Sequence, residues 1–241
     1  MDLGTAIQAF LDTRRLTASA SPLTVESYGR DLRDFASTAG GEARSIGELG
    51  PSDLERFLAY LHGKGQAATS VARKTTSLRQ FFRHCCAEGW LTEDPSRDLP
   101  SPRGDRRIPD PLSEDEMNRL MAACEPGLDY DGPRADDLRA RDRVLLLVLY
   151  AAGLRVSELC GLTLSQLELA GPWIRVRGKG RKERVVPLVP DVARALASYL
   201  EGPRLRLVDG ANLPWVFPGP KGTALTRQAF WYLLRRLART A

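Results

Sequence analysis

Apolar residues recur at helical spacing through the first part of the chain. The spacing i, i+3, i+4 and i+7 gathers side chains on one face of an α-helix, and it is followed by Leu54, Phe57, Leu58 and Leu61. Ser52 and Glu55 have the spacing of a capping box at the start of that helix. A second apolar stripe predicts a helix over about 69–88 and consists of Val71, Thr75, Leu78, Phe82 and Cys85. With a further helix start at Ser21 and Pro22, the pattern predicts four helices around one small core.

The second part of the chain mixes helical and alternating patterns. We expect helices at about 113–123, 137–152 and 192–200, and Thr226 as the N-cap of a last helix. The helix at 137–152 becomes wholly apolar from Val144, which predicts that it is buried. Residues 173–177 alternate like a β-strand, 184–188 are expected to be the returning strand, and a glycine-rich turn joins them. We expect Val216 and Phe217 to add an edge strand.

Residues 94–111 separate the two patterns. They contain five prolines and eight charged residues, a density that no helix or strand tolerates. We therefore predict a helical N-terminal domain at 1–93, an extended linker at 94–111 and a second domain at 112–241. The predicted fold class is mainly α with a small antiparallel β-sheet, in which a helical domain precedes an α+β domain.

Charge and composition narrow the possible partners only slightly. The 241 residues carry a net charge of +5, and 43% of them are hydrophobic, which favours a folded protein with a polyanionic partner. The four cysteines form no C-x-x-C pair and only two histidines are present, so we expect reduced core residues and no metal site. The chain starts without the features of a signal peptide, and its longest apolar run, 144–152, is too short to cross a bilayer. We therefore expect a cytoplasmic location and no membrane partner.

A lone arginine follows the apolar helix directly. Gly153 suits the left-handed position that closes a helix, and the chain then turns so that Arg155 projects from the domain. Glu158 lies close enough in the sequence to hold the guanidinium group. One interpretation is that Arg155 clamps a phosphate with two N–H groups while Glu158 orients it. The other interpretation is a simple salt bridge at the end of a helix.

The turn between the two expected strands consists almost entirely of glycines and cations. From Arg175 to Arg184 the chain carries six cations and one acid, and Lys179 stands at the tip. Glycines on both sides of Lys179 let the backbone approach a ligand closely, so this lysine is a candidate general acid for a leaving oxygen. The candidate DNA contacts of the hairpin are Arg177, Arg181, Lys182 and Arg184. A solvated basic turn without function is the alternative.

The polar side of the expected helix at 69–88 mixes cations with hydroxyl and amide groups. Such a mixture suits a helix in a DNA major groove, because cations bind phosphates while hydroxyl and amide groups read base edges. The candidates are Arg73, Lys74, Ser77, Gln80 and Arg83. An ordinary solvated helix face is the alternative.

Aromatic and histidine side chains add no candidate chemistry. Trp215, Trp231 and Tyr232 are expected to pack in the core or at an interface rather than to stack on bases. His62 and His84 have no carboxylate partner that would suggest a catalytic dyad. The candidate site therefore consists of arginine and lysine side chains, which suit a phosphodiester.

Taken together and in order, these motifs resemble the tyrosine recombinases, the phage integrase family, and within it the bacterial XerC/XerD type. The resemblance covers the chain from about Leu3 to Arg239. The segments that resemble the family's first catalytic arginine box, its hairpin lysine and the stretches before its His-x-x-Arg box are 155–159, 177–188, 216–218 and 225–231. Residues 21–24 and 28–32 resemble its helical core-binding domain.

The resemblance implies a C-shaped clamp in which a SAM-like core-binding domain and a catalytic domain surround double-stranded DNA at a recombination site. It also implies a tetramer on DNA, formed with identical chains or with a paired recombinase. In the family a tyrosine attacks the scissile phosphate to form a 3′-phosphotyrosine, arginines stabilise that phosphate, and the hairpin lysine protonates the 5′-oxygen, without metal or nucleotide. Here the matching residues are Arg155, Lys179 and, in support of Arg155, Glu158. Arg227 is a candidate DNA contact in the segment that precedes the His-x-x-Arg box.

The chain departs from the family pattern after these motifs. Nothing in it matches the His-x-x-Arg box, the later His or Trp, or the nucleophile, and the candidate tyrosines Tyr150, Tyr199 and Tyr232 fall in helices that do not correspond to the nucleophile's. We therefore expect a C-terminally incomplete Xer-type recombinase that binds recombination-site DNA near the nucleoid without cleaving it and forms tetramers more weakly. Two alternatives stay open. One is a non-catalytic DNA-binding protein that occupies a recombination site or regulates a full-length recombinase, and the other is an unrelated basic helical protein.

Overall fold

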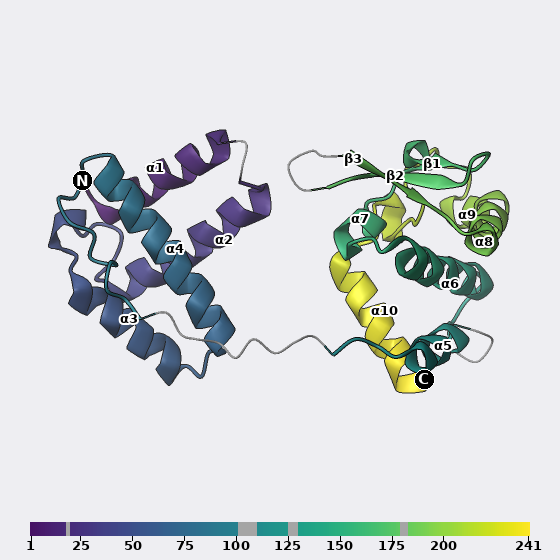
Figure 1. Cartoon of the computed structure of the whole chain (residues 1–241), viewed down its shortest axis with the longest axis horizontal. Coiled ribbons are helices and arrows are strands. Elements are labelled where there is room, and N and C mark those ends of the chain that lie inside the picture. The colour runs from purple at the N-terminus through teal and green to yellow at the C-terminus, as the bar shows by residue number, and fades with distance from the viewer. Residues whose placement is uncertain (18–19, 101–109, 125–129, 179–182) are drawn as a thin grey trace. The chain divides into compact units, whose positions relative to one another are not determined.

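The computed structural model describes residues 1–17, 20–100, 110–124, 130–178 and 183–241. The chain divides into two compact units, Met1–Ile108 and Pro109–Ala241, and each unit has its own buried core. Helices dominate both units, and the described strands form a three-stranded antiparallel sheet in the second (Figure 1). This arrangement confirms the mainly α fold with a small antiparallel sheet. No helix in the described part of the chain is long and apolar enough to cross a membrane.

The N-terminal unit is a bundle of four described helices, as the apolar stripes predict. They are α1 (Leu3–Leu16), α2 (Pro22–Thr38), α3 (Pro51–Gly63) and α4 (Ala68–Ala87), and the short 3₁₀ helix η1 (Ile46–Glu48) precedes α3. α4 packs against α1, α2 and α3 (Figure 1), so most of its circumference is covered. Aromatic rings fill the centre of the bundle: Phe35 meets Phe57 and Phe82 edge to face, with ring centroids 5.5 and 5.9 Å apart.

The helix starts in this unit follow the capping rules, but one of them differs from the start that the sequence predicts. Ser21 caps α2 as predicted. The prediction that Ser52 and Glu55 open α3 is wrong, because the helix begins directly after Gly50. The backbone N–H of Gly50 donates to Asp53 Oδ2 at 3.0 Å, so a carboxylate three residues further on supplies the acceptor.

The first residues of the predicted linker pack against the N-terminal unit. Ser96 is fully buried, and Leu99 is 7% exposed and joins the core of this unit. Asp94 Oδ1 accepts hydrogen bonds from the backbone N–H and the hydroxyl of Ser96, at 2.8 and 2.6 Å. The guanidinium of Arg79 on α4 donates to the carbonyl of Leu99. Residues 101–109 lie outside the described part of the chain, so the extended linker stays a prediction there.

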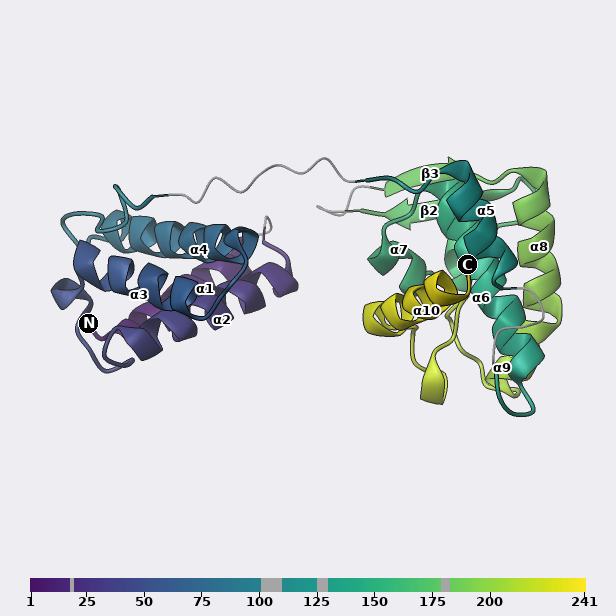
Figure 2. The same ribbon diagram turned by 90° about the horizontal axis from the view of Figure 1, so that it is seen from below.

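The C-terminal unit arranges helices around one central helix. Its helices are α5 (Glu114–Ala122), α6 (Ala135–Ala152), α7 (Val156–Cys160), α8 (Pro190–Glu201), α9 (Pro203–Val208) and α10 (Arg227–Thr240). α6 contacts α5, α7, α8 and α9, and the sheet and α5 lie on opposite sides of it (Figure 1). α10 packs against α7 and α5 (Figure 2). The predicted burial of α6 is confirmed for Val144, Leu145 and Val148, which are 0–6% exposed, but not for Tyr150 near its end, which is 59% exposed.

The sheet consists of β1 (Leu167–Glu168), β2 (Trp173–Arg177) and β3 (Glu183–Pro187), in the order β1-β2-β3. The predicted hairpin of β2 and β3 is present, and its register places Val176 opposite Arg184 and Ile174 opposite Val186. The prediction of an edge strand at Val216 and Phe217 is wrong. Both side chains are fully buried, and the third strand is β1, two residues that pair with the start of β2.

Candidate functional site

Arg155 stands at the junction between α6 and α7. Gly153 closes α6 in a left-handed conformation, with φ 55° and ψ 38°, which glycine adopts at little conformational cost. The side chains of Leu154 (6% exposed) and Leu159 (0%) anchor the chain on both sides of Arg155. Arg155 itself is the N-cap of α7, and its side chain is 66% exposed. The apolar anchors therefore fix the backbone while the guanidinium remains open to a ligand.

Glu158 accepts hydrogen bonds from two arginines. Arg155 donates its backbone N–H to Glu158 Oε2 and its Nη1 to Oε1, both at 2.8 Å. Arg184 donates Nη1 to Oε1 at 3.0 Å and Nη2 to Oε2 at 2.8 Å. The hydrogen bonds from Arg184 and from Arg155 outweigh the effect of burial and lower the pKa of Glu158 from 4.5 to about 2. The expected contact between Arg155 and Glu158 is present, whereas its use on a phosphate stays a prediction.

The strand register explains how Arg184 reaches Glu158. Alternate residues of a strand face opposite sides of the sheet, and Arg184 shares its side with Val186, while Val185 between them is 60% exposed. The partner of Arg184 on β2 is Val176, which is 2% exposed. Arg184 therefore belongs to the core-facing side of the sheet, where its guanidinium lies against α7. The alternation of Arg184, Val186 and Leu188 in the sequence is the signal that indicates this orientation, and the hairpin's basic composition obscured it.

The remaining sequence candidates of this unit are only partly described. Lys179, Arg181 and Lys182 lie outside the described residues. Arg177 is exposed at the end of β2. Arg227, also exposed, begins α10, and its charge opposes the rise in the pKa of Cys160 that burial causes. The structure thus brings Arg155, Glu158 and Arg184 together on α7 and β3, and it places Arg227 close to the end of α7.

In the N-terminal unit, α4 offers a narrow exposed stripe. Arg73 and Arg83 are exposed, and Gln80 is partly exposed between them. Arg73 Nη1 donates to the hydroxyl of Ser27 at 2.8 Å and also contacts Asp31, both on α2. Gln80 Oε1 accepts a hydrogen bond of 2.9 Å from an arginine of α1. These polar groups are held by neighbouring helices, and the cation of Arg73 remains 47% exposed.

Two other candidates on α4 lie on its inner side. Ser77 is 1% exposed and donates its hydroxyl to Asp31 Oδ2 at 2.7 Å. Lys74 is 9% exposed, and its ammonium group contacts Asp34. Both carboxylates belong to α2, so Ser77 and Lys74 join the two helices. Their assignment to a solvent-facing surface is therefore wrong, because the bundle covers a wider arc of α4 than its apolar stripe predicts.

The tyrosines and tryptophans differ widely in exposure. Tyr199 is 2% exposed and donates to a backbone carbonyl at 3.1 Å, and burial raises the pKa of its hydroxyl. Tyr150 and Tyr232 are 59% and 56% exposed. Trp231, at 49% exposed, lies beside Tyr232 on α10 with ring centroids 5.0 Å apart. These two aromatic residues do not pack in the core, and their expected location at an interface stays a prediction.

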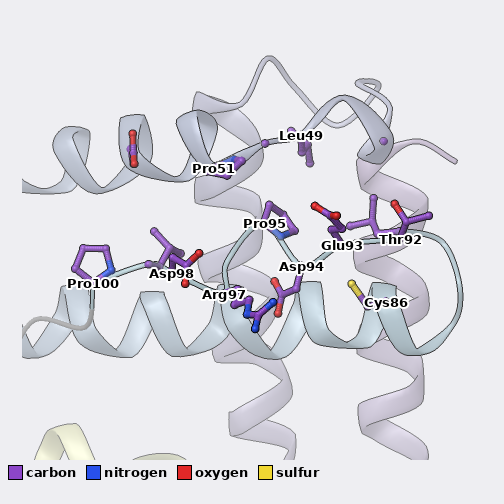
Figure 3. Close-up of a pocket in the computed structure, with 15 residues that line it drawn as sticks. Leu49, Pro51, Cys86, Thr92, Glu93, Asp94, Pro95, Arg97, Asp98 and Pro100 are labelled. Atoms are coloured by element: carbon purple, nitrogen blue, oxygen red, sulfur yellow. The ribbon is translucent and has the colours of Figure 1, made fainter.

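The N-terminal unit also contains a pocket, with a cavity volume of about 700 Å³. Figure 3 shows that it lies between α4, the start of α3 and the segment that follows α4. Its lining includes the carboxylates of Glu55, Glu93, Asp94 and Asp98. These four carboxylates outnumber the one lining cation, Arg97, and repel phosphates, so the pocket does not favour a nucleic acid. Across the described residues, no three His, Cys, Asp or Glu side chains gather as metal ligands.

Two family models match the chain. The model of the phage integrase N-terminal SAM-like domain matches residues 7–89. The model of the phage integrase family matches residues 111–241, which is more than half of the chain. The chain belongs to the phage integrase family. Its membership confirms the resemblance that the motifs around Arg155 and the hairpin suggest.

Relatives within the phage integrase family are similar over nearly the whole chain. The tyrosine recombinase XerD of Shewanella oneidensis is 36% identical over 235 residues, which are 98% of this chain and 76% of the relative. XerD of Pseudomonas aeruginosa is 37% identical, with the same coverage of both chains. Among solved structures, a lambda integrase dimer bound to a COC′ core site matches with a TM-score of 0.72 and 15% identity, over 100% of this chain and 78% of that one. This last likeness shows that the fold is shared.

Proposed function

We propose that this polypeptide binds double-stranded DNA at a recombination site, as a tyrosine recombinase of the XerD type. The observation that carries the proposal is the cluster of Arg155, Glu158 and Arg184. Two guanidinium groups share one carboxylate, so the cluster has a net positive charge. Arg155, which is 66% exposed, has further N–H donors that suit two oxygens of one phosphate. The similarity to XerD recombinases, at 36% and 37% identity, supports the same reaction class.

The N-terminal unit contributes a second contact surface in this proposal. Arg73 and Arg83 are both exposed, away from the buried side of α4, and nearly three helical turns separate them. Cations about 15 Å apart along the helix axis suit phosphates that are several nucleotides apart, while Gln80 between them suits a base edge. Arg177 and Arg227 would add phosphate contacts from the second unit. Lys179 matches the hairpin lysine that protonates the leaving oxygen in family members that cleave DNA.

We further propose that the 241-residue polypeptide binds DNA without cleaving it. Its two histidines, His62 and His84, lie in the N-terminal unit, and neither matches the His-x-x-Arg box of the family. Tyr199 is unsuited as a nucleophile, since its hydroxyl is buried and its pKa is raised. Charge stabilisation by Arg155 alone gives binding, but a phosphoryl transfer also needs a nucleophile and proton transfer.

Multimer formation on DNA is part of the same proposal. The solved structures of similar fold include a lambda integrase dimer bound to a core site and a lambda integrase tetramer bound to a Holliday junction. We propose that this chain occupies each half of its site beside a second copy or a paired recombinase. We propose for it a role in the resolution of chromosome or plasmid dimers or in the integration of a mobile element.

One experiment tests binding and cleavage together. The polypeptide is used to select duplexes from a randomised pool, and its affinity for the selected duplex is measured at increasing salt concentration. We expect a steep fall, with a slope of log affinity against log salt of about −0.9 for each phosphate contact. A nicked version of the same duplex should yield no covalent complex on a denaturing gel. A flat salt response would contradict the DNA-binding proposal, and a covalent band would contradict the non-cleaving one.

A further inference from the structure

The carboxylate of Glu158 joins two elements that lie far apart in the sequence. Its oxygen Oε1 accepts from Nη1 of Arg155 and from Nη1 of Arg184. Its oxygen Oε2 accepts from the backbone N–H of Arg155 and from Nη2 of Arg184. Glu158 is only 8% exposed, so these four donors take the place of water. A carboxylate held through both oxygens is restrained in its rotation, and the hydrogen bond from Nη1 orients the guanidinium of Arg155 on it.

We propose that Arg184 is a positioning residue, which orients Arg155 through Glu158 instead of binding DNA itself. The inference rests on the proposed function, in which Arg155 contacts a phosphate. It also reassigns Arg184, which the sequence places among the DNA contacts of the hairpin. The two arginines thus have different tasks, although both belong to the same basic cluster.

The geometry of the two arginines supports this division. Arg184 uses both terminal nitrogens on Glu158 in a planar, two-point contact, the arrangement that orients a carboxylate most strictly. Arg155 uses Nη1 alone among its side-chain donors. The side chain of Arg184 is 39% exposed against 66% for Arg155, and it lies on the core-facing side of its strand. Arg155 therefore has donors and space for a phosphate, while Arg184 is engaged.

Charge balance gives a second reason. Glu158 is ionised at any ordinary pH because its pKa is about 2, so its negative charge must be compensated within the cluster. With Arg184 in place, one guanidinium balances Glu158 and the charge of Arg155 is available to a phosphate. Without Arg184, the carboxylate and Arg155 form a neutral pair. The loss of Arg184 thus lowers the phosphate affinity of Arg155, even though Arg184 does not contact the phosphate.

A double-mutant cycle on DNA binding tests the inference. The four proteins are the unchanged chain, Arg155→Gln, Arg184→Lys and the double variant, and the probe is the duplex that the chain selects from a randomised pool. Lysine keeps the positive charge of residue 184 but cannot make the two-point contact. We expect Arg184→Lys to weaken binding about tenfold in the unchanged chain, the size of coupling found between residues of one ionic network. In the Arg155→Gln background the same change should have no effect.

Each other outcome has a definite meaning. If Arg184→Lys weakens binding equally in both backgrounds, or in neither, the positioning role is refuted. If Arg155→Gln alone leaves the affinity unchanged, the proposed function fails at Arg155 and the inference falls with it. Arg194→Lys is the matched control, since Arg194 lies on α8 in an ion pair with Asp191 whose side chains are 73% and 85% exposed. Arg194→Lys should leave the DNA affinity unchanged in both backgrounds.

A second cycle guards against a folding defect. If Arg184→Lys does not fold, as judged by its circular dichroism and unfolding transition, Glu158→Gln replaces it in the same scheme. Glutamine keeps the size of the side chain but loses the charge and one acceptor oxygen. We expect its effect on DNA affinity to disappear in the Arg155→Gln background too. Independent, additive effects of Glu158→Gln and Arg155→Gln would overturn the inference.

Discussion

Glu158 stays ionised in acid because two arginines hold its carboxylate. Burial alone would favour the neutral form. The donors from Arg184 and Arg155 reverse that preference and bring the pKa to about 2. The same contacts therefore stabilise the folded chain as long as the carboxylate is charged.

The stability that Glu158 contributes should depend on pH in a defined window. Its folded pKa lies below the unfolded value of 4.5, so the contribution is complete above pH 4.5 and is lost as the pH falls towards 2. We expect Glu158→Gln to unfold at lower denaturant concentration than the unchanged chain at neutral pH. The difference should shrink between pH 4.5 and 2, as measured by urea unfolding at each pH. A difference that is independent of pH would contradict the assigned ion pairs.

At single residues, sequence reasoning identifies chemistry better than orientation. The contact of Arg155 with Glu158 is predictable, because three residues separate them at a helix start. The task of Arg184 is not, since it depends on which face of a strand its side chain joins. Ser77 shows the same difficulty: a hydroxyl beside cations suits DNA, yet it lies 1% exposed against Asp31. Burial of a polar residue depends on partners from other elements, which its own sequence neighbours do not reveal.

At the scale of elements, carboxylates of α2 and polar groups of α4 join two helices of the bundle. Asp31 accepts from Arg73 and Ser77, and Asp34 contacts Lys74. Asp31 is 1% exposed, so its charge needs these donors in place of water. The pairs also fix the register of the two helices, since a shift by one turn would leave the buried carboxylate of Asp31 without a donor.

Asp31→Asn should destabilise the N-terminal unit by about 2 kcal/mol, the magnitude of hydrogen bonds to a buried charged group. A larger loss is not expected, because Arg73 is 47% exposed and water can solvate it. Chemical denaturation followed by circular dichroism measures the change. Glu26→Gln is the control, since Glu26 and Arg30 form a surface pair with side chains 61% and 69% exposed. Its effect should stay below about 1 kcal/mol, and equal effects of the two substitutions would refute the role of Asp31.

The existence of the elements follows from local patterns, whereas their ends and strand partners depend on contacts. The helical stripes and the β2–β3 hairpin are correctly predicted, because periodicity is a property of consecutive residues. The start of α3 differs from the prediction. The carboxylate of Asp53 accepts from the backbone N–H of Gly50, although Ser52 was the stronger local signal for a helix start. The third strand also differs: Val216 and Phe217 are fully buried without forming a strand, and the two-residue β1 pairs with β2. No sequence pattern identifies so short a strand.

At the scale of the whole molecule, the two units have separate cores. Among the described residues, the buried apolar side chains of the first unit end with Leu99, and those of the second begin with Leu120. Each unit therefore buries its own apolar surface and has the means to fold independently. The segment from Asp94 to Leu99 belongs with the first unit by its contacts.

A fragment of residues 1–100 should therefore fold alone and melt at the temperature of the N-terminal unit in the whole chain. A fragment of residues 1–93 lacks Leu99 and leaves Arg79 without that carbonyl acceptor, so we expect it to melt lower by about 4–8 °C, the shift that a loss of 1 kcal/mol causes in a unit of this size. Differential scanning calorimetry of both fragments and the whole chain measures this. Equal melting of the two fragments would show that the segment after residue 93 adds nothing to stability.

Trp231 gives the molecule an optical reporter of its own. The other tryptophans, Trp90, Trp173 and Trp215, are partly buried, whereas Trp231 is 49% exposed, with the guanidinium of Arg235 4.7 Å from its ring centre. Indole emission shifts to shorter wavelengths when water leaves the ring. A nucleic acid or another chain that covers Trp231 on α10 will therefore shift the emission maximum of the intrinsic fluorescence. Binding at this surface can be followed without a label.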